Sequence, residues 1–296
     1  MKKKCLSVLL SLTILLGSGI NTLAADENTN SGTLPDNLSY EVTFREIQND
    51  IIDYCTPLGI EFASQEYDEL LYSFIFSPSE ELSDIKQTYY SAYASVYFGR
   101  DNFNDILDSS IEQIREENIE LENTVQALSE QQNEPQPQIA YNLEAAQEYA
   151  SAYAMVNNYS YPEYGADCTN FASQILFAGG FNTTSLWNIW AGPGTIAWQT
   201  WVNAGAFCTY WGDHRGYIGK TCTSLAEVNK NSKPGDFLVW RNKTTFEYEH
   251  TQFVQTKVNG YIYCTQHSPS YYRQRLSDRI TDAAFNNSVV YQLNFN

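Results

Sequence analysis

Apolar residues recur at helical spacing along much of the first half of the chain. Three stretches, 46–54, 65–76 and 79–98, predict helices, whereas residues 40–44 alternate between polar and apolar and predict a short strand. From 105 to 131 the apolar residues occupy heptad a and d positions with glutamates around them, which predicts one long helix. This helix either packs on the preceding helices or pairs with a second chain, so self-association through residues 105–131 is one expectation.

The second half of the chain mixes helical and strand-like patterns. Residues 141–156 form an alanine-rich amphipathic pattern that predicts a helix. A second helix is expected to begin at Cys168 and to end at Gly179 and Gly180, because turn residues precede it and the double glycine breaks it. Two separate apolar stretches, at 236–240 and 288–295, predict strands.

The clearest strand signal is a hairpin. The pair Asn-Gly at 259–260 is typical of a type I′ turn, and it joins a strand at 250–258 to a strand at 261–267. Unbroken pairing outward from the turn makes His267 the diagonal neighbour of His250 on one face of the hairpin. With the strands at 236–240 and 288–295, the hairpin predicts a small antiparallel sheet, and hence an α+β fold with a helix packed on the sheet.

The cysteine at the expected helix start is the candidate nucleophile. Unpaired backbone N–H groups and the helix dipole favour a thiolate there, and the same N–H groups can hold an oxyanion. We assign Asp167 to capping the helix, because a carboxylate directed at the thiolate would raise the pKa of Cys168. His250 is the candidate base and His267 the candidate orienting group. The predicted catalytic set is therefore Cys168, His250 and His267, and the alternative is a buried structural cysteine with two coincidental histidines.

The residues around this cysteine resemble a known family, the putative amidase domain family of Gram-positive secreted proteins, over about residues 138–296. The resemblance rests on Tyr141-Asn142, Asp167-Cys168-Thr169-Asn170-Phe171, Gly179-Gly180, Lys233-Pro234-Gly235-Asp236, His250 and Gln266-His267. The family looks like a branch of the papain-like clan, close to CHAP and NlpC-type cell-wall peptidases. It implies a papain-like fold, in which the catalytic cysteine begins a helix that packs on a small antiparallel sheet.

Several further residues are candidates for supporting roles. In NlpC-type relatives a tyrosine ahead of the Asp-Cys pair stabilises the oxyanion, which makes Tyr161 and Tyr164 candidates here. Asn170 is expected to support the helix start by tying it to the neighbouring loops. Trp187 and Trp190 lie in a tryptophan-rich stretch and either line a substrate cleft or pack over the sheet.

Residues 1–25 have a lysine-rich opening, an apolar stretch at 6–16 and small residues at 24–25, which is typical of a cleaved secretory signal. The apolar stretch is far shorter than the ~20 residues that span a bilayer, and no second hydrophobic span follows. We therefore expect a secreted, extracellular protein with no membrane span. Together with the resemblance, this points to a Gram-positive bacterium.

Charge divides the chain in two. Residues 26–137 hold 24 acidic and 4 basic residues, whereas residue 138 onward holds 11 acidic and 10 basic residues. Such an acidic protein is a poor candidate for binding nucleic acid. The polar, proline-containing stretch 131–137 is the expected linker between a separate, acidic, mainly helical region at 26–130 and the papain-like domain at 138–296.

The cysteines outside the leader are five in number and widely scattered. Cys208 and Cys222 flank a glycine-containing loop, and the sequence leaves open whether they form a disulfide. No Cys-x-x-Cys or His-Glu-x-x-His spacing occurs, so we expect neither a metal site nor a cofactor.

These features support two hypotheses about function. The first is a secreted cysteine amidohydrolase or peptidase that cleaves an amide bond in a peptide or peptidoglycan-like substrate, including peptidoglycan stem peptides. The alternative is a catalytically inactive papain-like surface module that binds wall or protein partners through a tryptophan-rich cleft. The reactivity of Cys168 discriminates between them.

Overall fold

Six antiparallel strands form one sheet in the part of the chain that the computed structural model describes, residues 34–79, 81–100, 103–132 and 140–295. They lie in the order β1-β6-β2-β3-β4-β5. Their bounds are β1 Ile218–Cys222, β2 Phe237–Asn242, β3 Tyr248–Val258, β4 Tyr261–Gln266, β5 Tyr271–Arg275 and β6 Ser288–Leu293.

Ten α-helices accompany this sheet in the described residues, and the fold is α+β as the hydrophobic pattern predicts. Their bounds are α1 Phe44–Cys55, α2 Gln65–Phe76, α3 Asp84–Gly99, α4 Ile111–Gln131, α5 Leu143–Tyr153, α6 Cys168–Ala178, α7 Ile196–Val202, α8 Ala204–Cys208, α9 Leu225–Asn231 and α10 Ala284–Asn287. Short helical turns lie at Thr56–Leu58, Phe103–Ile106, Ile189–Ala191, Thr209–His214 and Leu276–Asp278.

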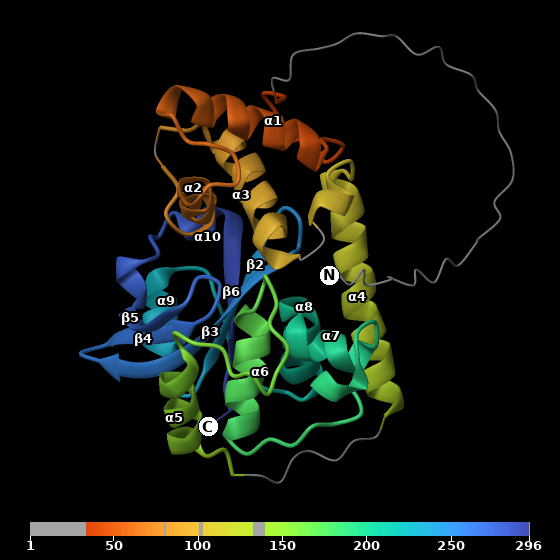
Figure 1. The fold of residues 1–296 in the computed structure, drawn as a ribbon, viewed down its shortest axis with the longest axis vertical. Coiled ribbons are helices and arrows are strands. Elements are labelled where there is room, and N and C mark those ends of the chain that lie inside the picture. The colour runs from red at the N-terminus through yellow and green to blue at the C-terminus, as the bar shows by residue number, and fades with distance from the viewer. Residues whose placement is uncertain (1–33, 80, 101–102, 133–139, 296) are drawn as a thin grey trace, which may run out of the picture. The chain divides into compact units, whose positions relative to one another are not determined.

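The central strands β2 and β3 are buried on both faces of the sheet over most of their length. Alternate residues of β2 point to opposite sides, so Leu238 and Trp240 join a core with α1 to α3, whereas Phe237 and Val239 join a core with α5 to α8. Figure 1 shows α1 to α3 (orange) and α5 to α8 (green to teal) on different sides of the strands. A strand covered on both faces needs apolar residues at successive positions, which is why Phe-Leu-Val-Trp occurs in β2.

The N-terminal helices are not a separate region. They share one hydrophobic core with the sheet, in which the ring of Phe76 on α2 lies 5.2 Å from that of Trp240 on β2. Arg100, at the end of α3, forms an ion pair of 2.8 Å with Glu247 just before β3. The expectation of a separate acidic region is therefore corrected, because the apolar faces of these helices are buried against the sheet while most of their carboxylates face outward.

Two local predictions in this region fail for the same reason, the hydrogen-bonding of short polar side chains. Thr43 caps α1 by accepting from the Glu46 amide, so residues 40–44 form no strand and contribute only an isolated bridge from Thr43 to Ser110. Ser110 likewise caps α4 in a reciprocal pair with Gln113. The predicted single helix over 105–131 therefore begins only at Ile111.

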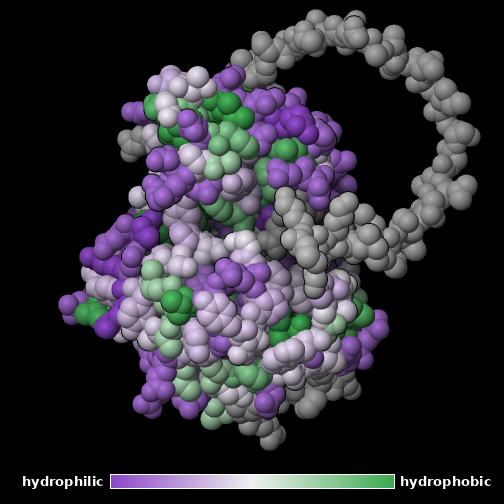
Figure 2. Space-filling view, in the orientation of Figure 1, coloured by the Kyte–Doolittle hydropathy of each residue, from purple (hydrophilic) through white to green (hydrophobic). Residues whose placement is uncertain are grey.

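The heptad face of α4 packs within the chain. Ile111 and Ile114 lie in the core with α1 to α3, and Val125 lies in the core with α5 to α8. The face of the molecule in Figure 2 shows hydrophobic residues as small separate patches. Nothing in the described residues supports self-association through 105–131.

Residues 1–25, the expected leader, and residues 133–137 of the expected linker lie outside the described residues. None of the helices that the structure describes is long and apolar enough to cross a membrane. All five cysteines in the described part of the chain are free thiols, so Cys208 and Cys222 form no disulfide. They lie in different cores, Cys208 with α5 to α8 and Cys222 with α1 to α3.

Candidate active site

Cys168 is the first residue of α6, as the turn residues before it predict. The hydroxyl oxygen of Thr169 lies 2.9 Å from that of Thr251, which holds the start of α6 against β3 beside His250. Only 8% of Cys168 is exposed. Burial raises the pKa of its thiol, while the Thr169 hydroxyl and the Thr251 backbone oppose this rise, so the structure holds Cys168 as a covered, largely protonated thiol.

His250 lies on β3 opposite Trp240 of β2, and its ring centroid is 5.9 Å from that of Phe76 on α2. Its Nε2 is buried and has no hydrogen-bond partner among the described residues. Burial lowers the pKa of His250 to about 4, against a smaller opposite effect of the Gln266 side chain. The imidazole is therefore neutral at neutral pH, which is the form that accepts a proton.

His267 does not orient His250. Its Nδ1 lies 2.7 Å from Asp167 Oδ2, its Nε2 lies 2.8 Å from the Tyr153 carbonyl oxygen, and its ring stacks on Phe171 at 3.9 Å between centroids. Both partners are acceptors, so both ring nitrogens must donate for the two bonds to form together. His267 thus ties α6 to the end of α5 and has no ring nitrogen left for another histidine.

A β-bulge explains why the predicted partnership of the histidines fails. Near the turn the register is as expected, with Val258 opposite Tyr261. Between Val254 and Thr256 the register shifts by one residue, and beyond it Phe253 pairs with Thr265. A shift of one residue moves side chains to the other face of a pair. His267 therefore shares a face with Phe253, whereas His250 lies on the opposite face.

Gln266 occupies the place that the sequence assigned to His267. It is one residue earlier on β4, and it lies on the same face as His250 and Gln252. Its Oε1 accepts from Gln252 Nε2 at 2.6 Å, and its Nε2 donates to the Pro269 carbonyl at 3.0 Å. Sequence reasoning missed Gln266 because a bulge leaves no clear mark in the alternation of apolar residues.

Asp167 does not cap α6. It makes no capping hydrogen bond, and its Oδ1 accepts instead from the Asn170 side chain at 2.8 Å and from the Tyr164 amide at 3.3 Å. Asn170 also donates to the Pro162 carbonyl and accepts from Trp201 Nε1. Asp167 and Asn170 therefore tie the start of α6 to the preceding loop.

The two candidate oxyanion tyrosines face the tryptophans of this loop region. The Tyr164 hydroxyl accepts from Trp198 Nε1 at 2.9 Å, and the ring of Tyr161 stacks on Trp201 with centroids 6.1 Å apart. Their role at an oxyanion stays a prediction.

Tyr72 of α2 is a further residue at the site that the sequence did not indicate. Its ring packs on Phe76 with centroids 4.5 Å apart, and its hydroxyl is buried without a hydrogen-bond partner among the described residues. Burial raises the pKa of Tyr72, and the nearby Cys168 thiol adds to this rise. The Gln266 side chain acts in the opposite direction. Tyr72 therefore stays a neutral O–H group, and the groups around it include the Gln266 side chain and the Cys264 and Cys168 thiols.

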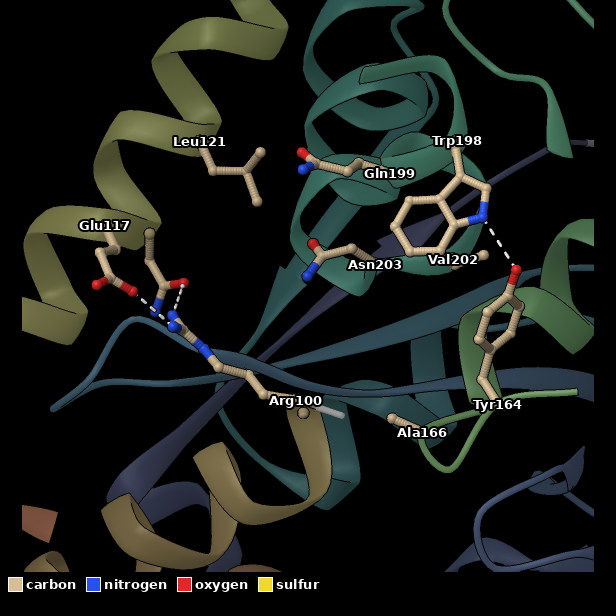
Figure 3. Close-up of a pocket in the computed structure, with 11 residues that line it drawn as sticks. Arg100, Glu117, Leu121, Tyr164, Ala166, Trp198, Gln199, Val202 and Asn203 are labelled. Atoms are coloured by element: carbon tan, nitrogen blue, oxygen red, sulfur yellow. Dashed lines mark hydrogen bonds and ion pairs between the residues drawn. The ribbon is translucent and has the colours of Figure 1, made fainter. Parts of the chain in front are cut away.

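A cavity of about 400 Å³ lies beside the loop that leads into Cys168. Figure 3 shows Trp198 and Tyr164 on one side of it and Arg100 and Glu117 on the other. The predicted cleft residues Trp187 and Trp190 are not among its lining residues. Trp187 is fully buried and stacks on Trp201, so it belongs to the core, whereas Trp190 is 62% exposed.

Among the residues that the structure describes, no group of three His, Cys, Asp or Glu side chains is arranged to hold a metal ion. The thiol at the start of α6 and the imidazole on β3 lie on adjoining elements.

Comparison with known proteins bears on what this site does. No curated protein and no solved structure matches the chain. A family model does match, over residues 140–291, and its description, a putative amidase domain, supports hydrolysis of an amide bond. Because the matched residues make up just over half of the chain, the protein belongs to the putative amidase domain family.

Proposed function

We propose that the protein is a secreted, cysteine-dependent hydrolase that cleaves an amide bond in an extracellular peptide, with peptidoglycan stem peptides as the favoured substrate class. One observation carries the proposal. Cys168 begins α6, which the contact between Thr169 and Thr251 holds against β3, and β3 carries the neutral His250, whose Nε2 has no hydrogen-bond partner among the described residues. The family match supplies the amide bond as the target.

The steps follow from the chemistry of these groups. Cys168 Sγ attacks the amide carbonyl carbon while the thiol proton passes to His250, and the carbon–nitrogen bond then breaks as His250 returns the proton to the leaving amine. Water, deprotonated by His250, attacks the thioester and releases the carboxylic acid and the thiol. Backbone N–H groups at the start of α6 are suited to hold the oxyanion. Gln266, on the same face as His250, is a positioning residue for the imidazole.

The covered thiol requires that something move before substrate reacts. The Tyr72 hydroxyl is buried near Cys168, and the ring of Tyr72 is itself partly exposed. A carbonyl carbon must come to ~3–3.5 Å from the sulfur to react, and a thiol that is 8% exposed leaves little room for that approach. We therefore assign Tyr72 the role of covering the thiol in the resting protein.

The same burial favours the second candidate function, a binding module that has lost catalysis. A raised thiol pKa and a closed approach are what a structural cysteine shows. The two functions differ in one measurable property, which is whether the reactivity of Cys168 depends on His250.

The decisive experiment follows alkylation of Cys168 by iodoacetamide from pH 5 to 9, located by peptide mass spectrometry. It compares four proteins: the wild type, His250→Gln, Tyr72→Ala and the double variant. Tyr72→Ala is included to uncover the thiol. His214→Gln is the matched control, because this histidine lies in the Thr209–His214 turn outside the site. Alkylation of uncovered Cys168 that persists below pH 7 and is lost only with His250→Gln supports the enzyme.

Alkylation that follows an ordinary thiol with a pKa of about 8.5, with or without His250, would overturn the proposed function. A second arm incubates the protein with Gram-positive cell-wall peptides and detects newly released amines by mass spectrometry, with Cys168→Ala as the inactive control. Wall binding without release of amines would favour the binding module.

A further inference from the structure

The cavity beside the loop into Cys168 has two walls of different origin. One wall comes from the end of α3 and the middle of α4, and it includes Arg100, Glu117 and Leu121. The other comes from α7 and the segment Tyr164–Ala166. Ala166 precedes Cys168 by two residues, so its Cα lies within about 7 Å of the Cα of the cysteine. The cavity therefore reaches the neighbourhood of the proposed nucleophile.

The positive charge in this cavity is already neutralised. Arg100 donates from Nε to Glu247 at 2.8 Å, from Nη1 to Glu117 at 2.6 Å and from Nη2 to Asn118 at 2.9 Å. All three guanidinium nitrogens are engaged, and two carboxylates face one cation, which leaves a net negative charge. A carboxylate on a ligand would meet repulsion here, whereas a cationic group would be attracted.

The rest of the lining combines apolar surface with an acceptor that lacks a partner. Leu121, Trp198 and Val202 contribute apolar surface. In Figure 3 the side-chain amide of Gln199 extends from α7 toward α4. Its Oε1 is buried and has no hydrogen-bond partner in the part of the chain that the structure describes. A buried acceptor without a donor is costly, and a ligand N–H group would satisfy it.

We propose that this cavity receives the side chain of the substrate residue next to the scissile amide, and that it selects an apolar stem ending in an ammonium group, as in lysine. The inference rests on the proposed function and names the substrate class of that site. It also assigns a role to the N-terminal helices, which lie outside the matched residues 140–291 but supply Arg100, Glu117 and Leu121. The stem would lie against Leu121 and Trp198, and the ammonium would donate to Gln199 Oε1 and Glu117.

The test uses acetylated amino-acid chloromethyl ketones, which alkylate a thiol beside the site that holds their side chain. Lysine, norleucine and glutamate probes are compared by the second-order rate of alkylation of Cys168, each divided by the iodoacetamide rate of the same protein. Norleucine shares the stem of lysine and lacks its ammonium. We expect the lysine probe to react about tenfold or more faster than norleucine, as a charge-assisted hydrogen bond permits, and glutamate to react most slowly.

Three variants test whether the preference for the lysine probe arises in this cavity. Glu117→Gln and Gln199→Leu should each reduce the lysine-to-norleucine ratio severalfold, and Leu121→Trp, which fills the cavity, should slow both probes. Glu120→Gln is the matched control, because it makes the same charge change on α4 but Glu120 is not among the residues that line this cavity. It should leave the ratio unchanged. Equal rates for lysine and norleucine, or a faster glutamate probe, would overturn the inference.

A binding measurement separates failure of the cavity from failure of the proposed enzyme. Cys168→Ser protein is titrated with acetyl-lysine amide and acetyl-norleucine amide, followed by tryptophan fluorescence with Trp198→Phe as the blank. Saturable binding of the lysine compound that Leu121→Trp abolishes supports the cavity even if Cys168 proves unreactive toward every probe. Absence of any lysine preference in this titration, with Cys168 reactive and dependent on His250, refutes the cavity and leaves the enzyme standing.

Discussion

Thr169 on α6 and Thr251 on β3 share a buried hydrogen bond between hydroxyl groups 2.9 Å apart. Thr169 follows Cys168 and Thr251 follows His250, so one contact sets the position of both candidate catalytic residues. The Thr251 backbone also interacts with the Cys168 thiol, so helix and strand are joined here by polar contacts as well as by packing. The threonine pair therefore defines the registration of α6 on the sheet.

The first prediction concerns this pair. Thr169→Val leaves the Thr251 hydroxyl buried and unpaired, and it should lower the free energy of unfolding by about 1–3 kcal/mol. Thr251→Val should act likewise, whereas the double variant should lose less than the sum, because no hydroxyl is then left unpaired. Urea unfolding of the four proteins in a double-mutant cycle measures this coupling. Strictly additive losses would mean that the two hydroxyl groups do not stabilise each other.

The second prediction concerns His267. His267→Gln removes the ring that contacts the buried carboxylate of Asp167 and should lower the free energy of unfolding by about 1–3 kcal/mol. Adding Asp167→Asn should restore part of this loss. Because His267 binds Asp167 and the Tyr153 carbonyl, the pH profile of Cys168 alkylation in the folded protein should keep its wild-type shape. A profile shifted in the same way as that of His250→Gln would instead assign His267 a role in the chemistry.

The third prediction is the pH dependence that His250 gives to stability. Burial lowers the pKa of His250 from 6.5 to about 4, so between these pH values the unfolded chain binds a proton that the folded chain does not. The free energy of unfolding should therefore fall as the pH drops from 6.5 toward 4. The fall amounts to about 3 kcal/mol, at ~1.4 kcal/mol for each pKa unit. Urea unfolding between pH 4 and 7 should show it in the wild type, and His250→Gln should lack it.

The neighbouring Glu249 makes the control for this measurement. Burial raises the pKa of its carboxyl to about 8, so its effect runs the other way and stability is lost as the pH rises from 4.5 toward 8. Glu249→Gln removes that loss and should leave the histidine effect in place. A pH dependence below 6.5 that survives in His250→Gln would assign the effect to other groups.

The fourth prediction concerns Tyr72. Tyr72→Ala removes the ring that we propose as the cover of the thiol, and it should raise the rate of Cys168 alkylation by about tenfold or more, as expected when the open form becomes dominant. Tyr72→Phe keeps the ring and should leave the rate near that of the wild type. Comparing the two variants separates the effect of losing the ring from the effect of losing only the hydroxyl group. If Tyr72→Phe lowered turnover of an amide substrate without changing alkylation, the hydroxyl would be a donor in the reaction and not part of a cover.

Much of the fold follows from local sequence. The Asn259-Gly260 turn has the positive φ angles that a type I′ turn requires, and it places Val258 opposite Tyr261 as predicted. The helix at Cys168 and the apolar strand at 237–242 were likewise readable from turn residues and hydrophobic pattern. These features depend on residues a few positions apart, so their chemistry is contained in short stretches of the chain.

The details of the candidate site were harder to predict from the sequence. The bulge between Val254 and Thr256 puts the side chains of His250 and His267 on opposite faces of the hairpin. The residue types in the hairpin are nevertheless those of two regular strands, so the sequence does not reveal the bulge. Tyr72 and Arg100 reach the region of Cys168 from helices whose tertiary packing could not be inferred from their own periodicity. One extra residue in a pair of β-strands changes the local structure little, but it moves all the side chains beyond it to the other face.

The sequence by itself thus determined the family, the candidate nucleophile, the turn of the hairpin and the apolar faces of most helices, because each is encoded by neighbouring residues. Only the tertiary structure decided that His250 and Gln266 share a face, that His267 serves Asp167, and that the acidic N-terminal helices complete the core and one wall of the cavity. The physical reason is that these relationships join residues far apart in the chain, such as Asp167 with His267 and Phe76 with Trp240. Burial of apolar surface across the whole sheet selects them over alternatives that are locally equivalent.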